Sequence, residues 1–320
     1  MKRTKAAFVI GLLTVRFVFA QCPKYDLQPP HLNNVLVKSL TTQNSSSKIF
    51  TYTYSIVSGI TSTGCINGID IDISIPLNSL ALSDSGLSDY PRYVDRSTFK
   101  FDTTVRVTSV GIPRLPSYKG LSSAWFASFS VDSTVGWFRA IPEYRLEPGG
   151  RIDGIVMTSH ALPGIRRFII SPSYSPKPDV EVTPQNEDSL HQNATESLDE
   201  EEAFQQLEKS IKVRGVTVGP TPPPFPFVPA TFLDTLVNYV IQSKQFRWVE
   251  TQATANKYFG YFNAAKSNLQ SNDIDGARII LHTVLSQTIL DTTSNLTNEA
   301  FALIHYNTEY LIAKLPSSSN

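Results

Sequence analysis

The segment VGPTPPPFPFVPATF, residues 218–232, separates two parts of the sequence that have different hydrophobic periods. It contains six prolines within ten residues: Pro220, Pro222, Pro223, Pro224, Pro226 and Pro229. Proline fixes φ and lacks a backbone N–H, so successive prolines favour a stiff, extended chain over a strand ladder or a helix interior. We therefore predict a spacer at residues 219–229, between a β-rich domain and a helical domain.

The residues before the spacer alternate between apolar and polar side chains. IFTYTYSI, residues 49–56, places aromatic and isoleucine side chains opposite threonine and serine, and GIDIDISI, residues 68–75, repeats the alternation. On a strand, this period of two sends one set to a core and the other to water. Both segments are typical of an antiparallel sheet with one solvated face.

Six further runs of strand-like residues follow, separated by turn sequences such as SDSG and EPGG. Many short strands with Gly and Pro between them favour a β-sandwich, with a barrel as the alternative. We assign residues 21–218 to this domain. Residues 175–211 are a predicted insertion in it, formed by an acidic, proline-bearing loop and a short helix, LDEEEAFQQLEKS.

The residues after the spacer have the helical period. Four apolar faces fall within residues 230–315, and a compact antiparallel arrangement of four helices would bury them. Thr231, followed by Asp234, resembles a capping box at the first helix, and Thr297 is the expected cap of the fourth. The whole chain is thus predicted to be an α+β multidomain protein, an N-terminal antiparallel β-sandwich followed by a small C-terminal four-helix bundle.

The helical part resembles a known family. YFNAAKSNLQSNDIDGARIILHTVLSQ, residues 261–287, and LTNEAFALIHYNTEYLIAKL, residues 296–315, are similar to the FIMAH modules of secreted bacterial proteins in their leucine and alanine spacing. The resemblance covers residues 232–315 and implies an appended helical module without catalytic residues. Residues 145–172 are similar only in a general way to strands of exported bacterial β-sandwich proteins.

The N-terminus has the layout of an export signal. Residues 1–20, MKRTKAAFVIGLLTVRFVFA, combine a basic start with an apolar run that is too short for a permanent membrane anchor. We predict a signal peptide and a secreted, periplasmic or cell-surface protein. No later segment is apolar enough to span a bilayer.

The chain has two cysteines, Cys22 and Cys65. In an oxidising compartment they can form a disulfide, which would stabilise the fold by about 3–4 kcal/mol through loop closure. Two free thiols are an alternative, and a lipid on Cys22 is another, although Gln21 stands where a lipoprotein signal has a small residue.

Charge and motifs exclude several classes of function. The 28 Lys and Arg balance 28 Asp and Glu, so no overall positive field favours nucleic acid. The five histidines show no metal-ligand spacing, and we expect no metal, cofactor or catalytic residue. A hydrolase centred on His160, next to Ser159, is the weakest alternative, since no GxSxG motif is present.

Aromatic residues are concentrated between residues 124 and 144. Trp125, Phe126, Trp137 and Tyr144 are the candidate ligand-binding residues, because strand alternation would place some of them on an outer sheet face. Core packing of the two tryptophans is the interpretation that we favour for them, because the interior of a sandwich needs bulky residues. The sequence thus predicts a secreted, non-catalytic binding or surface-interaction protein whose partner is an extracellular protein or a glycan; the alternative is a carbohydrate-binding protein that uses exposed aromatics of the β domain.

Overall fold

The structure is a computed structural model of the whole chain. The residues that it describes are 31–73, 107–111, 125–129, 134–139, 145–173 and 211–316. The predicted signal peptide and almost all of the predicted insertion at residues 175–211 lie outside them.

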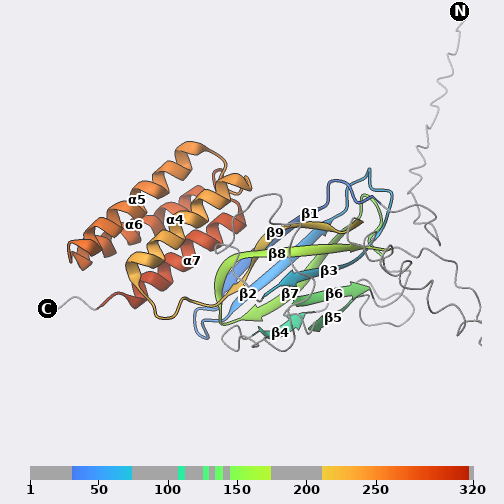
Figure 1. Cartoon of the computed structure of the whole chain (residues 1–320), viewed down its shortest axis with the longest axis horizontal. Helices are drawn as coiled ribbons and strands as arrows, with labels where there is room; N and C mark the ends of the chain where they lie inside the picture. Colours follow the sequence, from blue (N-terminus) through green and yellow to red (C-terminus); the bar gives the residue numbers. More distant parts are fainter. Residues whose placement is uncertain are drawn as a thin grey trace, which may run out of the picture.

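Nine strands of the described residues form two antiparallel sheets (Figure 1). One sheet has the order β1-β2-β7-β4 and the other the order β5-β6-β3-β8-β9. The strands are β1 (Leu36–Gln43), β2 (Phe50–Val57), β3 (Ile66–Asp72), β4 (Val107–Gly111), β5 (Trp125–Phe129), β6 (Thr134–Arg139), β7 (Arg151–Ser159), β8 (Leu162–Pro172) and β9 (Val213–Thr221). The expected α+β composition and antiparallel pairing are confirmed.

The two alternating segments are strands, as predicted. In β2, Phe50, Tyr52, Tyr54 and Ile56 are buried, and the threonines between them are half-buried. Side chains of the two sheets meet, because the ring of Tyr54 lies 6.1 Å from that of Trp137 on β6. Their contact makes one continuous hydrophobic core from strands of both sheets.

The boundary of the proline-rich segment differs from the prediction. Strand β9 continues to Thr221, so Gly219 and Pro220 are part of the ladder and Pro220 lies opposite Pro163 of β8. The ladder tolerates this pair because β9 is an edge strand, and β8 is paired with β3 only from Phe168 onward. A proline without an N–H costs least where no neighbouring strand needs that donor.

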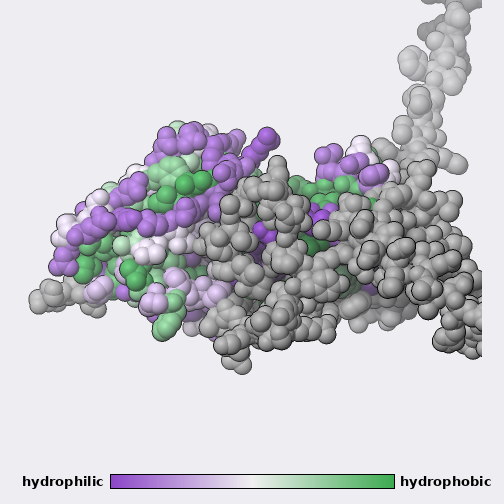
Figure 2. All heavy atoms as spheres, viewed as in Figure 1, coloured by the Kyte–Doolittle hydropathy of each residue, from purple (hydrophilic) through white to green (hydrophobic). Residues whose placement is uncertain are grey.

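Four helices follow: α4 (Pro229–Gln245), α5 (Gln252–Gln270), α6 (Ile274–Asp291) and α7 (Asn298–Lys314). They lie beside one end of the sheets (Figure 1), and Figure 2 shows hydrophilic side chains over much of their visible face. Helix α4 packs against α5 and α7, and α6 packs against α5 and α7. No helix in the described residues is long and apolar enough to cross a bilayer.

The caps agree only partly with the sequence prediction. Helix α4 begins at Pro229, with Val228 as N-cap, so the predicted capping box at Thr231 is wrong; proline already has the φ of a first helical turn. Thr297 is the N-cap of α7, although its side chain makes no capping hydrogen bond. The carboxylate of Asp273 caps α6 by accepting the Gly276 N–H.

Helix α7 covers the free edge of strand β1. The backbone N–H of Ser39 donates to Oε1 of Glu299 at 2.7 Å, and the hydroxyl of Tyr306 donates to the carbonyl of Thr41 at 3.4 Å. The ring of Tyr306 also packs edge-on against Phe50, at 5.3 Å between centroids. Because β1 pairs with β2 on one side only, these bonds satisfy polar groups that would otherwise lie unpaired on an edge.

A second contact joins α7 to the other sheet. The Asn307 amide donates to the carbonyl of Pro163, at 2.9 Å, and to Leu303 of its own helix. Asn307 is almost fully buried, so both bonds are made away from water. Helix α7 is therefore bound to both sheets.

We expect Glu299→Ala to destabilise the protein by about 1–3 kcal/mol, because it leaves the buried Ser39 N–H without an acceptor. Glu299→Gln keeps an acceptor oxygen and should cost less. Urea unfolding at pH 7 measures both, and equal losses for the two variants would contradict the role of the hydrogen bond.

Candidate functional site

The two tryptophans proposed as ligand-binding residues are core residues. Trp125 is 1% exposed and Trp137 is 0% exposed. Trp125 lies on β5 and Trp137 on β6, which are neighbouring strands of one sheet. The ring of Trp137 contacts that of Tyr54 from the other sheet. Both indoles are therefore buried in the interior, where a ligand does not reach them. Core packing, the favoured interpretation, is therefore confirmed for both tryptophans, and the alternative of an exposed platform at these two residues is wrong. Tyr144 and the side chain of Phe126 lie outside the described residues.

The disulfide stays a prediction. Cys65 is buried, with 1% of its surface exposed, directly before β3. Cys22 lies outside the described residues.

The hydrolase alternative depends on His160 and its neighbour Ser159, and the structure does not arrange them as a base and a nucleophile. His160 is exposed, while the hydroxyl oxygen of its neighbour Ser159 is buried and accepts the N–H of Ala161 at 3.1 Å. In the helices, His305 Nδ1 and the hydroxyl of Thr288 are hydrogen-bonded at 2.8 Å, but Thr288 is fully buried. Neither arrangement presents a nucleophile to a cavity.

A charged cluster lies on the outer face of the second sheet. Asp70, Asp72, Arg167 and Arg214 line a small cavity of about 40 Å³ there. Burial raises the pKa of Asp70 to about 6, and the nearby charge of Lys212 only partly opposes this effect. Among the described residues, no group of three or more His, Cys, Asp or Glu is placed to hold a metal ion.

A much larger pocket lies where the α4–α5 and α6–α7 connections meet. We call it the interhelix pocket; its volume is about 520 Å³. Its lining residues are Lys244, Arg247, Trp248, Glu250, Thr292, Thr293, Ser294, Asn295, Leu296 and Thr297. This set combines a half-buried indole, two cations, one carboxylate and several hydroxyl groups.

Backbone hydrogen bonds join the two connections that form the pocket. Val249 and Leu296 form an antiparallel bridge and are both buried. On either side of it, Thr297 N–H donates to Trp248 at 2.9 Å, and Glu250 N–H donates to Asn295 at 3.0 Å. The walls of the pocket are thus fixed to each other by main-chain bonds rather than by side chains alone.

The end of α4 holds Trp248 in its place. The N–H of Trp248 donates to the carbonyl of Ser243, and the N–H of Arg247 donates to that of Lys244, which is the bond pattern of a Schellman motif. Arg247 has φ 60°, the left-handed conformation in which glycine is usual. A residue with a Cβ costs about 1 kcal/mol more than glycine there.

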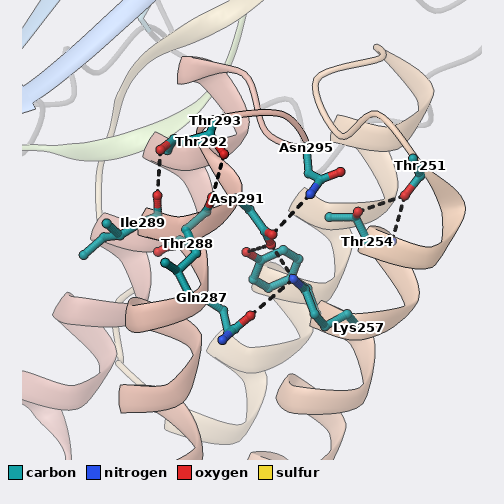
Figure 3. Close-up of polar contacts among 12 residues, drawn as sticks. Thr251, Thr254, Lys257, Gln287, Thr288, Ile289, Asp291, Thr292, Thr293 and Asn295 are labelled. Carbon is teal, nitrogen blue, oxygen red and sulfur yellow. Dashed lines mark hydrogen bonds and ion pairs between the residues drawn. The ribbon is translucent and has the colours of Figure 1, made fainter.

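A buried carboxylate holds the α6–α7 connection (Figure 3). Asp291 accepts hydrogen bonds from the Tyr258 hydroxyl at 2.6 Å, from Lys257 Nζ at 2.5 Å and from the Asn295 amide at 3.3 Å. Burial alone would raise the pKa of Asp291, but the hydrogen bonds from Lys257 and Tyr258 outweigh it and hold this pKa below its usual range. The carboxylate is therefore a charged anchor beneath the pocket wall.

The pocket offers several groups that can bind a ligand. The hydroxyls of Thr292 and Thr293 donate to carbonyls of the preceding helical turn, which leaves their oxygens as acceptors. Lys244 Nζ donates to the carbonyl of Glu250 at 2.8 Å. An indole among hydroxyls and cations can hold a ring with an apolar face and polar edges.

Sequence reasoning missed Trp248, although it is one of three tryptophans in the chain. It follows Lys244 and Arg247 in the short connection between two helical faces, outside the periodic segments that drew attention in the sequence. The aromatic density of residues 124–144 gave the stronger signal, and its two tryptophans are core residues.

We expect Asp70→Asn to stabilise the protein at pH 8, by about 1–3 kcal/mol. The pKa of Asp70 is higher in the folded state than in the unfolded state, so its contribution to stability is complete below about pH 4 and is lost as the pH rises through about 6. Urea unfolding between pH 4 and pH 8 should show that the variant loses this dependence. The exposed Asp153→Asn is the control, and an equal effect there would contradict the assignment.

We expect Asp291→Asn to cost about 2–4 kcal/mol at pH 7, because Lys257 and Tyr258 lose a buried charged acceptor. The low pKa of Asp291 makes its contribution complete at neutral pH and reduces it as the pH falls below about 4, so the difference from the wild type should shrink at pH 3. Asp234→Asn removes an exposed pair with Lys266 and should cost less than about 1 kcal/mol. A larger loss for Asp234→Asn would argue against the anchor.

Comparisons with protein-family models, with curated proteins and with solved structures find no match to this chain. Its role is therefore inferred from its own residues.

Proposed function

We propose that this chain is a secreted, non-catalytic binding protein whose ligand is a saccharide, held in the interhelix pocket. The proposal includes a β-sandwich formed by the two sheets and a helical bundle similar to FIMAH modules, exported by the N-terminal signal. The observation that carries it is the placement of Trp248 in a pocket of about 520 Å³ lined by hydroxyl groups.

The composition of the lining supports a saccharide. A pyranose has an apolar face of C–H groups that packs on an indole, and a rim of hydroxyls that both donate and accept hydrogen bonds. The pocket offers the threonine oxygens as acceptors and the Lys244 ammonium and Arg247 guanidinium as donors. A purely apolar ligand would give the threonine acceptor oxygens and the guanidinium no hydrogen-bond partner, at a cost in affinity.

The volume and the rigidity of the pocket also support binding. A cavity of about 520 Å³ is within the range of small-ligand sites. Its walls are joined by the Val249–Leu296 bridge and anchored by Asp291, so a ligand need not order them on binding. Preorganised walls favour affinity because less conformational entropy is lost.

Because the pocket lies between helices, we expect the helical region, rather than the sheets, to recognise the ligand. The sequence pointed to aromatics of the β domain, but Trp125 and Trp137 are buried there. We place recognition in the helical region, and the sheets serve as the support to which α7 is bound through Glu299.

We expect Trp248→Ala to weaken saccharide binding at least tenfold, because a stacked aromatic contributes much of the affinity of such a site. Its loss of stability should be about 2 kcal/mol, less than for a fully buried tryptophan, because the half-buried ring also packs on Phe246 at 5.1 Å between centroids. Glycan-array binding followed by calorimetry measures affinity, and thermal melts measure stability.

Trp137→Ala is the matched control. It should cost about 3–5 kcal/mol in stability, because the ring is fully buried, while any folded fraction keeps its affinity. Unchanged affinity of a folded Trp248→Ala protein would rule out the pocket as the binding site.

A further inference from the structure

Two helices of the protein end in the same way but with different residues. After α5, Asn272 has φ 62°, and the N–H groups of Asn272 and Asp273 donate to Leu269 and Asn268 in the Schellman pattern. Asparagine tolerates this left-handed conformation because its short side chain bonds locally. At the equivalent place after α4, the chain has Arg247, whose long side chain has no such compensation.

The strained arginine lies in the interhelix pocket. Backbone strain persists where the side chain that causes it serves another role, and such positions concentrate at binding sites. Arg247 is exposed and lines the pocket beside Trp248, so replacing it with glycine would relieve the backbone and leave the pocket without its guanidinium. We infer that the guanidinium contacts the ligand.

The charges of the lining indicate an anion with a single charge. Lys244 and Arg247 together carry two positive charges, and Glu250 carries the one negative charge of the lining. The lining therefore has a net charge of plus one. Arginine binds carboxylates through two parallel hydrogen bonds. A phosphate ester carries nearly two negative charges, and the Glu250 carboxylate would repel the additional one. A sulfate ester carries one negative charge, as a carboxylate does, and the experiment below separates these two anions.

We propose that the ligand is an acidic saccharide that contains a uronic acid. Its carboxylate pairs with Arg247 and Lys244, while its ring stacks on Trp248. This inference rests on the proposed function, because it names the saccharide class that the same pocket binds.

The test compares three probes by isothermal titration calorimetry on the full mature chain: a uronic acid oligosaccharide, its methyl ester and a neutral oligosaccharide of equal length. We expect the free acid to bind at least tenfold more tightly than the other two. The difference should shrink as salt is raised, because ions screen exposed charges. A sulfated oligosaccharide that binds more tightly than the uronate would overturn the choice of carboxylate.

Arg247→Gly should raise the melting temperature by about 2–4 °C and weaken binding of the free acid at least tenfold, with a smaller loss of affinity for the neutral probe. Asn272→Gly changes the equivalent position away from the pocket and should leave affinity unchanged. Should Arg247→Gly fail to fold, Arg247→Gln keeps the strained backbone and removes the charge, and it must weaken binding of the acid equally.

The outcomes separate the two proposals. If no oligosaccharide binds the wild type, the proposed function fails. If the acidic and neutral probes bind equally and Arg247→Gly leaves both affinities unchanged, only the choice of an acidic ligand fails.

Discussion

The hydrogen bond from the backbone of Ser39 to the carboxylate of Glu299 joins the helices to the sheets. Strand β1 is an edge strand, and its outward N–H and C=O groups need partners wherever water is excluded. Helix α7 supplies them at Ser39 and Thr41. A sheet edge that could pair with another chain is thereby covered by a helix of the same chain.

The same helix connects this edge to the interhelix pocket. Its N-cap, Thr297, lines the pocket, and Glu299 is only two residues further along. The α6–α7 connection, which precedes α7, is held by the hydrogen bond from Asn295 to Asp291 and by the bridge between Leu296 and Val249. The pocket wall therefore continues directly into the element that is bound to the sheet, which limits its freedom to move.

The interior also contains a buried charged side chain. Arg166 of β8 is fully buried, its Nε donates to Pro220 at 2.6 Å, and burial lowers the pKa of its guanidinium. Tyr239 of α4 lies near enough for their charges to interact, and burial raises the pKa of this phenol to about 12. The two terminal nitrogens of Arg166 are buried without a hydrogen-bond partner among the described residues, so the polar groups around the guanidinium satisfy it only in part.

The sequence by itself determined the local structure. The alternation at residues 49–56 and the apolar faces after residue 230 predicted strands and helices, because period decides which side chains share a face. Only the tertiary structure decided which aromatics are available. Trp125 and Trp137 are buried, and Trp137 packs on Tyr54 of the other sheet, whereas Trp248 is half-buried in a pocket where two distant connections meet. The hydrophobic period also predicted neither the strand at Pro220 nor the left-handed conformation of Arg247. Pairing with β8 fixes the first, and the end of helix α4 fixes the second. Burial and strain depend on contacts between residues far apart in the chain, and no local pattern contains them.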